Sequence, residues 1–320
     1  MIKVAMAKNI YLGIDWGGTF IKLGIFNQKS KLLSNHKISS PNFSKPSKFF
    51  KLLKKIIKSE LKNKRLSLSQ LKGAGIGAPG IIEMKTGRIY YLPNIKGWKN
   101  FPFKKIFTKE LGIPLALDND GNIAALAELK RGKAKGIKRG LVLTLGTGLG
   151  SGLILNGKVF HGKTSAVEAG HIPLTINGTA CGCGAKGCVE TFLGNKYFIK
   201  KVTSMLKQKG FSLKKFKNLT PLDVYRLALQ NNKVAIKAWI HYGYILGLFC
   251  RGLVNLLNLE AIVLGGGLSK ASRFFMPEMK KTINRQAMHP LNKQVKIYKS
   301  KLGDNFGIIG AYELIKTQIK

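Results

Sequence analysis

A strand that ends in a glycine-rich turn and continues into a second strand occurs twice in this chain, and the repetition limits the folds open to it. The first copy reads NIYLGID, then Gly17-Gly18-Thr19, then FIKLGIFN, with KLLSNHKI as a further strand of an antiparallel meander. The second copy reads LVLTLGTGLG and SGLILNGKVF, in which Asn156-Gly157 suits a type I′ hairpin turn. The repetition predicts an α/β protein built from two related lobes with a cleft between them.

Regular periodicity elsewhere in the chain predicts the remaining elements. LKGAGIGAPG and LALDND each read as a strand, and we expect Asp120 in the loop just before the next helix. The apolar region 244–264 contains Arg251 and Glu260, so we expect a buried helix and then a strand there rather than a membrane span. Cys250 in that helix is expected in the core. Helices are expected over 48–62, 196–208, 221–230, 234–257 and the final GIIGAYELIK, and AIVLGGGLS reads as a strand before a third glycine turn.

The chain is strongly basic, with 55 Lys and Arg residues, 14 Asp and Glu residues and a formal net charge of +41. Such a charge attracts polyanions and phosphorylated ligands. The lysines are spread along the whole chain, however, which is typical of a solvated surface, and the basic runs contain no nucleic-acid recognition module. We therefore expect no specific nucleic acid and no membrane among its partners. Because no secretory signal is evident and metal binding explains the thiols best, we expect a cytoplasmic protein.

His171 and three of the four cysteines, Cys181, Cys183 and Cys188, form the most specific local pattern. Three thiolates and one imidazole are the ligand set of a closed tetrahedral Zn²⁺ site, and the intervening glycines let the backbone turn tightly around a small ion. A disulfide or redox pair is the alternative. A Cys-x-Cys bridge is strained, however, and no second cysteine cluster offers a partner for the third thiol. The segment therefore predicts structural zinc.

Acidic residues are scarce and gather in the glycine-rich and metal-ligating segments. Glu168 lies three residues before His171, and Glu190 lies two residues after Cys188, so a bound metal would hold both carboxylates on one rigid surface. The alternative is that they are solvated surface acids, as most carboxylates are. Because acids are so few, we interpret at least four of the following as site residues: Asp15, Asp118, Asp120, Glu128, Glu168 and Glu190.

Glycine turns at strand ends are the candidate nucleotide-binding elements. In the segment 15–19, the missing Cβ atoms let N–H groups and a hydroxyl approach a phosphate, and Asp15 could orient Mg²⁺ through water. In isolation, an ordinary hairpin turn is an equal explanation. LGTGLG at 145–150 and the glycines at 265–267 repeat the arrangement, and three such turns favour a nucleotide site. The G-x-G-x-x-G match at 75–80 does not open a helix, and the P-loop match at 157–164 continues a strand, so neither is interpreted as a phosphate loop.

Eight segments together, in order and over nearly the whole chain, resemble the ROK family of sugar kinases and repressors. The resemblance implies a two-lobed, actin-like ATPase (ribonuclease H-like) α/β fold with a zinc-binding insertion. It implies a small lobe over 1–118, completed by a C-terminal helix at 304–320, and a large lobe over 119–303 with the zinc module at 168–190. The segments are DWGGT at 15–19, GAPG at 77–80, LPNIKGW at 92–98, DNDGNIAALAE at 118–128, LGTGLGSGLILNG at 145–157, EAGH at 168–171, CGCGAKGCVE at 181–190 and IVLGGG at 262–267.

The same resemblance implies roles for individual residues. Asp120 matches the catalytic base, which takes the proton from a sugar hydroxyl as that hydroxyl attacks the γ-phosphate. Asp15 matches the acid that faces Mg²⁺. The matches to sugar-binding positions are Gly80, Asn119, Asp120, Glu168, His171 and Glu190, those to zinc ligands are His171, Cys181, Cys183 and Cys188, and those to nucleotide-phosphate contacts are Gly17, Gly18, Thr19, Thr147, Gly148, Gly266 and Gly267.

The function implied by the resemblance is phosphorylation of a hexose hydroxyl, glucokinase-like with a sugar 6-phosphate product, by a homodimer that uses ATP, Mg²⁺ and Zn²⁺. A polyphosphate-dependent glucokinase is an alternative, because the high charge and Lys22 would suit a polyanionic donor. An N-acetylhexosamine or fructose kinase is another. Repressors of the family carry a DNA-binding helix-turn-helix before the DxGGT segment, and only 14 residues precede Asp15 here, so we expect a kinase rather than a repressor.

Overall fold

The structure is a computed structural model of the chain, and it describes residues 9–40, 45–92, 95, 97–164, 167–213 and 216–319. Pro93, Asn94 and Lys96 of the LPNIKGW segment lie outside the described residues. The contacts within the chain divide it into two compact units. The first unit comprises Met1–Gly132, Val159–Val167 and Asp304–Lys320, and the second comprises Lys133–Lys158 and Glu168–Gly303.

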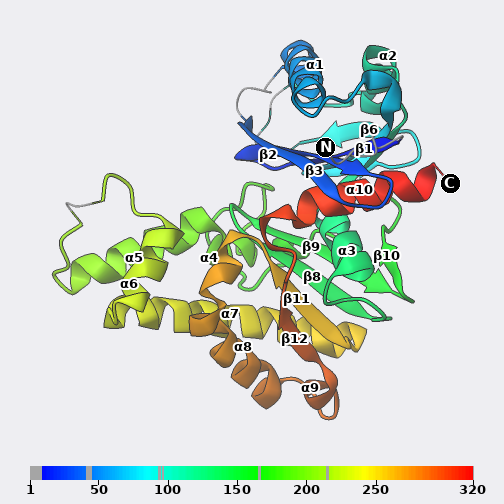
Figure 1. Ribbon diagram of the computed structural model, residues 1–320. Coiled ribbons are helices and arrows are strands. Elements are labelled where there is room, and N and C mark those ends of the chain that lie inside the picture. Colours follow the sequence, from blue (N-terminus) through cyan, green and yellow to red (C-terminus); the bar gives the residue numbers. More distant parts are fainter. Residues whose placement is uncertain are drawn as a thin grey trace, which may run out of the picture. The chain divides into compact units, whose positions relative to one another are not determined.

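The first unit contains a five-stranded sheet, helices on both faces of that sheet, and a separate two-stranded sheet (Figure 1). Its strands are β1 (Ile10–Trp16), β2 (Phe20–Asn27), β3 (Leu32–Ser39), β4 (Leu71–Ala78), β5 (Ile81–Glu83), β6 (Arg88–Tyr91) and β7 (Leu115–Asn119). Its α-helices are α1 (Pro46–Asn63), α2 (Phe103–Leu111), α3 (Asp120–Arg131) and α10 (Phe306–Gln318).

The sheet of the first unit has the strand order β3-β2-β1-β4-β7. The first three strands form the expected antiparallel meander, and β4 and β7 continue beside β1 in parallel. On one face, β1 packs against α1 through large side chains, including Trp16 and Phe49, whose ring centroids are 4.5 Å apart. On the other face α10 approaches so closely that a Cβ at Gly75 would lie 1.7 Å from the Ala311 carbonyl oxygen. Glycine in the strand therefore lets the helix backbone contact the sheet directly.

The second unit has a five-stranded sheet of its own and most of the helices of the chain (Figure 1). Its sheet contains β8 (Gly140–Leu145), β9 (Leu149–Leu155), β10 (Lys158–Phe160), β11 (Ala261–Gly265) and β12 (Lys296–Lys299). Within β10, the contacts assign Lys158 to this unit and the two residues that follow to the first. Its α-helices are α4 (Glu190–Leu193), α5 (Asn195–Gln208), α6 (Pro221–Leu229), α7 (Lys233–Leu257), α8 (Ser272–Gln286) and α9 (Leu291–Gln294).

The order of the second sheet, β10-β9-β8-β11-β12, corresponds strand for strand to that of the first. β8 and β9 are antiparallel, and β11 and β12 lie beside β8 in parallel. In the turn before β10, Asn156 and Gly157 have φ values of 52° and 72°, as the expected type I′ turn requires. The repetition seen in the sequence is thus confirmed as two sheets of one topology.

Helix α7 is the long apolar element of the second unit. Among the residues that the structure describes, it is the one helix long and apolar enough, by length and composition, to cross a membrane. Its side chains pack against α5, α6 and α8, and Trp239 and Cys250 have no exposed surface. β11 follows from Ala261. The expected buried helix followed by a strand, with Cys250 in the core, is confirmed.

Some elements differ from the expectation. Asp120 is the first residue of α3 and not part of the preceding loop, because the Asn119 side chain caps the helix by accepting a hydrogen bond of 2.8 Å from the Gly121 N–H. Helices α2 and α8 and the β5–β6 pair were not expected. By its contacts the first unit extends to Gly132, beyond the expected lobe boundary at residue 118, because α3 packs on α10.

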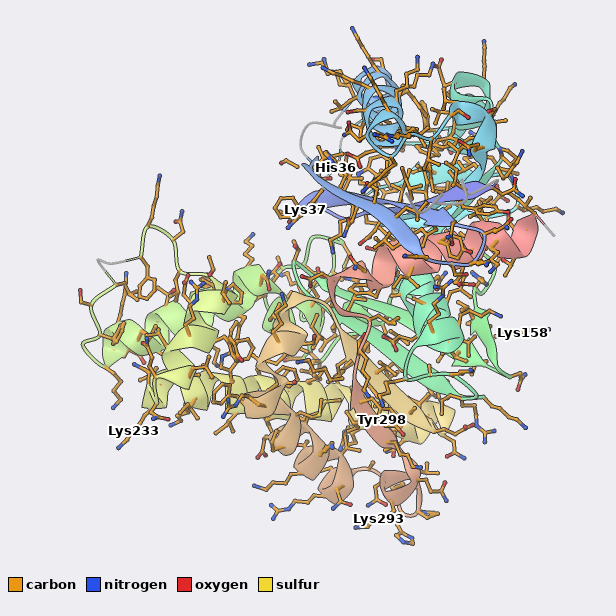
Figure 2. All side chains as sticks on the ribbon, viewed as in Figure 1. His36, Lys37, Lys158, Lys233, Lys293 and Tyr298 are labelled. Atoms are coloured by element: carbon orange, nitrogen blue, oxygen red, sulfur yellow. The ribbon has the colours of Figure 1, made fainter. Side chains whose placement is uncertain are left out.

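The basic side chains are distributed over many elements. Lys37, Lys158, Lys233 and Lys293, labelled in Figure 2, belong to β3, β10, α7 and α9. Side chains that end in nitrogen project from both units in the same view. The charge therefore has the dispersed character that the sequence indicates.

Candidate active site

The carboxyl ends of three parallel strands bring candidate residues together at one edge of the first sheet. Asp15 pairs with Gly77 in the register of β1 and β4, and Ala78 pairs with Asn119 in that of β4 and β7. Gly80 follows the end of β4, and Asn119 Nδ2 donates a hydrogen bond of 3.0 Å to its carbonyl oxygen. Ligands of α/β sheets bind at such edges. The fold thus joins Asp15, Gly80 and Asn119, which are far apart in the sequence.

Asp118 organises the segment that carries the candidate base. Its side chain is 2% exposed. Its Oδ1 accepts hydrogen bonds from the Asn119 N–H at 2.7 Å and from Asn122 Nδ2 at 2.9 Å, and its Oδ2 lies 2.8 Å from His161 Nε2. The next acid, Asp120, is half-buried in the first turn of α3, where the partial positive charge of the helix favours a carboxylate. Asp118 therefore supports the backbone from which Asp120 projects.

His161 is a contact that the sequence analysis did not predict. It follows β10, and its side chain is 30% exposed. Its hydrogen bond to the Asp118 carboxylate raises the pKa of His161, although partial burial acts in the opposite direction. Only the scarcity of histidine, with five in the chain, could have drawn attention to it.

The glycine turn between β1 and β2 is open at its tip. The Gly17 N–H donates a hydrogen bond of 3.0 Å to the Phe20 carbonyl oxygen and closes the turn. Gly18 and Thr19 are exposed. A Cβ added at Gly18 would meet nothing within 4 Å, so the fold itself does not require glycine there. The turn can therefore admit another group close to its backbone.

Asp15 precedes that turn and lies close to a lysine. The Asp15 carboxylate is 4.0 Å from Lys22 Nζ, which also donates a hydrogen bond of 2.7 Å to the Asp304 carbonyl oxygen. Burial raises the pKa of Asp15, and the charge of Lys22 partly opposes that shift. Lys22 is therefore engaged by the first unit itself, which weakens its assignment as a ligand for a polyanionic donor.

The four expected metal ligands gather at one point of the second unit. One ligand atom from each of His171, Cys181, Cys183 and Cys188 lies within 4.8 Å of the others. Cys183 Sγ is 3.6 Å from Cys188 Sγ, and Cys181 Sγ is 3.5 Å from His171 Nδ1. A tetrahedron with Zn–S bonds of about 2.3 Å and Zn–N bonds of about 2.0 Å has edges of about 3.7 and 3.5 Å. The donor set and its spacing therefore fit zinc, and all four cysteines are free thiols.

Both candidate carboxylates of the second unit lie against this metal cluster. Glu168 Oε2 is 4.0 Å from His171 Nε2, the ring nitrogen that faces away from Cys181. Glu190 Oε1 is 4.0 Å from Cys181 Sγ. Burial raises the pKa of Glu168; His171 lowers that pKa, and Glu190 adds a small increase. The two acids thus lie beside the candidate metal ligands.

Glu190 also connects the metal cluster to the glycine turn after β8. Its Oε2 accepts a hydrogen bond of 2.9 Å from the Leu149 N–H. On the other side of the turn, the Asn195 N–H at the start of α5 donates 3.0 Å to the Gly146 carbonyl oxygen. Thr147 and Gly148 therefore lie in a turn that is fixed from both sides.

The third glycine turn follows β11, the parallel neighbour of β8. Gly266 has φ of 82°, and a Cβ there would lie 2.4 Å from the Leu145 carbonyl oxygen. Both features require glycine. At Gly267 a Cβ would meet nothing within 4 Å. Because Gly265 pairs with Thr144, the turns 146–148 and 265–267 lie at adjacent strand ends of the second sheet.

The candidate residues thus form one group in each unit. The group in the first unit comprises Asp15, Gly17, Gly18, Thr19, Gly80, Asn119 and Asp120. The group in the second unit comprises Thr147, Gly148, Glu168, His171, Cys181, Cys183, Cys188, Glu190, Gly266 and Gly267.

Comparison with known proteins finds relatives over almost the whole chain. The ROK family model matches residues 11–318. The chain belongs to the ROK family. It is 34% identical to a glucokinase of Halalkalibacterium halodurans, with 98% of this chain and 97% of that protein covered, and 27% identical to the xylose repressor of Caldicellulosiruptor bescii, with 95% and 77% covered. A ROK family glucokinase of Streptomyces griseus, solved in complex with glucose and AMPPNP, has the same fold, with a TM-score of 0.84, 24% identity, and coverage of 96% and 99%.

These comparisons confirm the family and the two-lobed α/β fold predicted from the sequence. Both enzymes and repressors of the ROK family occur among the relatives. The match to the glucokinase extends over nearly the full length of both chains, whereas the xylose repressor has further sequence outside the match.

Proposed function

We propose that this ROK protein is an ATP-dependent hexose kinase, with glucose as the expected substrate and a sugar 6-phosphate as the product. The observation that carries the proposal is the position of Asp120. It lies in the first turn of α3, next to the capping residue Asn119, whose side chain is bonded to Gly80 at the carboxyl edge of the sheet. The similarity to a glucokinase over nearly the full length of both chains supports the same activity.

Asp120 acts as the base in this proposal. It accepts the proton of the sugar hydroxyl as the hydroxyl oxygen bonds to the γ-phosphorus and the bond to the departing nucleoside diphosphate breaks. Phosphoryl transfer needs an acceptor held in line and charge neutralisation, and one carboxylate at the acceptor oxygen is sufficient. Asn119 binds a neighbouring hydroxyl, and Gly80 lines the pocket beside it.

Glu168, His171 and Glu190 hold further hydroxyls of the sugar. His171 would bind the metal through Nδ1, which lies beside Cys181, and would donate a hydrogen bond from Nε2, whereas the two carboxylates accept from hydroxyls. The carboxylate of Glu190 has acceptor capacity beyond its bond to Leu149. Zinc, held by His171 and the three cysteines, supplies orientation to these groups.

The glycine turns bind the nucleotide phosphates. Their backbone N–H groups and the hydroxyls of Thr19 and Thr147 are donors for phosphate oxygens. Asp15 would hold Mg²⁺, because this hard cation prefers oxygen ligands. The proposed phosphate contacts are Gly17, Gly18, Thr19, Thr147, Gly148, Gly266 and Gly267.

A sugar panel with coupled ADP detection tests the proposal. Glucose, fructose, mannose and their N-acetylamino derivatives are each offered with ATP, and glucose is also offered with polyphosphate while sugar phosphate is measured. We expect the highest kcat/KM with glucose and ATP. Asp120→Asn should lower kcat by about 10²–10⁴-fold with an unchanged melting temperature. Glu110→Gln, which removes an exposed acid paired with Lys54, is the matched control and should leave kcat unchanged.

Each alternative has its own outcome in these assays. Faster turnover with polyphosphate than with ATP would support the polyphosphate-dependent enzyme, and a preference for fructose or an N-acetylhexosamine would reassign the substrate. Phosphorylation of none of the sugars, with a sequence-specific DNA complex instead, would support a repressor. A cytoplasmic location, expected from the sequence, and a homodimer, implied by the family resemblance, remain proposals, and sedimentation equilibrium tests the second.

A further inference from the structure

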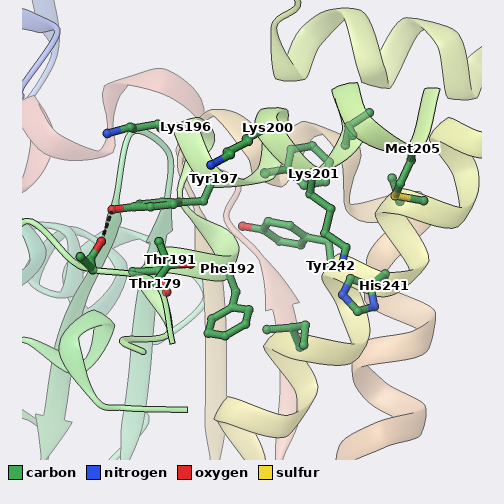
Figure 3. A pocket seen from close by; sticks show the side chains of 15 residues that line it. Thr179, Thr191, Phe192, Lys196, Tyr197, Lys200, Lys201, Met205, His241 and Tyr242 are labelled. Carbon is green, nitrogen blue, oxygen red and sulfur yellow. Dashed lines mark hydrogen bonds between the residues drawn. The ribbon is translucent and has the colours of Figure 1, made fainter. Parts of the chain in front are cut away.

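The second unit contains a cavity of about 420 Å³ that has no part in the proposed kinase site (Figure 3). It is bounded by α5, by α7 and by the residues on either side of the metal cluster, Thr179–Ala180 and Thr191–Phe192. Its volume is in the range of sites that bind small molecules, about 300–1,000 Å³.

Apolar and aromatic side chains form most of the cavity wall. Phe192 and Ile245 line it from two elements, and Phe198 packs against Trp239 with ring centroids 4.5 Å apart. Tyr197 borders the cavity and is fixed by the hydrogen bond of 3.2 Å from its hydroxyl to the Ala180 carbonyl oxygen, drawn in Figure 3. Such a wall suits a flat apolar body.

The side chains that line the cavity and can carry charge at neutral or mildly acidic pH are all basic, so that charge is positive. Lys196, Lys200 and Lys201 come from α5 and His241 comes from α7 (Figure 3), and none of the described residues that line the cavity is Asp or Glu. Burial lowers the pKa of His241, and the charge of Lys201 lowers it further. The lining therefore has a positive potential that only an anion can neutralise.

A buried hydroxyl adds a polar anchor. Tyr242 is 2% exposed, and its hydroxyl has no hydrogen-bond partner among the described protein groups. In Figure 3 this hydroxyl points toward the side of the cavity where Tyr197 and Thr191 lie. A buried hydroxyl without a partner costs free energy, so it favours a ligand that offers an acceptor.

We propose that this cavity is a second binding site for a small organic anion, with a planar apolar body and a phosphate or carboxylate head group. The body lies against Phe192, Tyr197 and Ile245. The head group is held by Lys196, Lys200 and Lys201 and accepts a hydrogen bond from Tyr242. The lysines alone would attract any anion. The apolar wall favours those anions that also have an apolar body.

Occupancy of the cavity should act on the metal segment. Ala180, which Tyr197 holds, directly precedes the zinc ligand Cys181, and Thr191 directly follows Glu190 and donates 2.7 Å to the Cys188 carbonyl oxygen. A ligand on this wall therefore contacts both ends of the segment that carries the zinc ligands and Glu190. Because Glu190 is a proposed sugar-binding residue, a bound ligand should change the affinity for the sugar. This effect rests on the proposed kinase function, whereas the binding of the ligand itself does not.

Calorimetry with phenyl phosphate tests the binding. Phenol and inorganic phosphate serve as controls for the body and the charge, and benzoate distinguishes the head groups. We expect phenyl phosphate or benzoate to bind at least about tenfold more tightly than phenol or inorganic phosphate. If neither phenyl phosphate nor benzoate binds more tightly than phenol and inorganic phosphate, or if no probe binds, the proposal is overturned.

Variants locate the site. Replacing Lys196, Lys200 and Lys201 by Met should weaken phenyl phosphate binding about tenfold or more, because three favourable charges are removed. The matched control replaces Lys280, Lys293 and Lys296 by Met, which removes the same charge elsewhere in the second unit. Equal losses in the two variants would show a general charge effect and refute the site. Tyr242→Phe should weaken binding severalfold while the melting temperature is kept or raised, because it deletes an unpartnered hydroxyl.

Kinetics then tests the coupling. Phenyl phosphate at saturation should change KM for the sugar at least about twofold in the wild type and leave it unchanged in the Lys196/Lys200/Lys201 variant. An equal change in both proteins would refute the coupling. Failure of the kinase proposal appears as no turnover with any sugar, whereas failure of this inference appears in the calorimetry, which needs no turnover.

Discussion

Replacement of His161 by Ala should show how much the His161–Asp118 pair contributes to the stability of the first unit. Asp118 is nearly fully buried, and His161 Nε2 is the only side-chain group described at its Oδ2, 2.8 Å away. A hydrogen bond to a charged partner contributes about 1.5–3 kcal/mol. His161 is 30% exposed, so water replaces part of that bond in the variant. We therefore expect His161→Ala to lower the free energy of unfolding by about 1–2 kcal/mol at pH 6.

The pH dependence gives the sharper test. The Asp118 carboxylate raises the pKa of His161 in the folded chain above that of an unfolded histidine, about 6.5. A group with a raised folded pKa stabilises fully below the unfolded pKa, and this stabilisation is lost as the pH rises through the folded pKa. The difference between wild type and His161→Ala should therefore be largest near pH 6 and smaller near pH 9.

Urea unfolding followed by tryptophan emission measures this difference, because Trp16 and Trp98 both lie in the core of the first unit. His161→Gln is the control: its amide can donate to Asp118 Oδ2 but does not titrate. His161→Gln should be more stable than His161→Ala, and the gap in unfolding free energy between these two variants should be the same at pH 6 and at pH 9. A loss in His161→Ala that is the same at both pH values, or larger at pH 9, would refute the reasoning. In the kinase assay, kcat should fall up to about tenfold in His161→Ala and less in His161→Gln, because Asp118 positions the backbone of Asn119 and Asp120.

Two further predictions concern the second unit. Cys183→Ser should remove stoichiometric zinc, measured by elemental analysis, and should lower both the melting temperature and the affinity for the sugar. The control is Cys250→Ser, in the core of α7, which should keep the metal. A Cys183→Ser variant that retains both zinc and stability would contradict the ligand assignment. Gly266→Ala should lower the free energy of unfolding by about 1–3 kcal/mol and raise KM for ATP, because φ is 82° and the added Cβ would lie 2.4 Å from the Leu145 carbonyl oxygen. Gly267→Ala should lower stability less, because a Cβ there has open space. Equal stability of the two variants would show that the close approach at Gly266 is unimportant.

Local signals in the sequence were sufficient for much of the fold. Glycine at a strand end, β-branched and aliphatic runs, and helical spacing of apolar residues identified the two sheets and most long helices, because these patterns act over a few residues. The cluster of candidate metal ligands was equally accessible, since three cysteines and a histidine lie within 18 residues. The roles assigned to the acids and glycines came from the family resemblance and remain predictions.

What the sequence could not predict depends on contacts between distant segments. His161 and Asp118 are 43 residues apart, and only the return of the chain to the first unit after β10 brings them together. Gly75 falls in an apparent dinucleotide motif, but its small size serves the close approach of α10, more than 200 residues later. Likewise, the packing of α3 on α10 leaves no mark in the sequence of α3. Each of these contacts is fixed by the tertiary fold.

The few acids of this chain are supported in two different ways, and only one of the two involves the proposed metal. Asp120 has its support from ordinary protein chemistry: a helix N-terminus, a capping asparagine and a buried Asp118–His161 pair. Glu168 and Glu190 lie instead on a segment with only short helical turns, which backbone hydrogen bonds cross, such as that of 2.9 Å from the Val189 N–H to the Ile172 carbonyl oxygen. In the proposed kinase, four ligands on one ion would hold this segment in addition to those bonds. Because Glu190 also bonds to Leu149, beside the turn that contains Thr147 and Gly148, loss of the metal should loosen the proposed sugar and phosphate contacts of the second unit together.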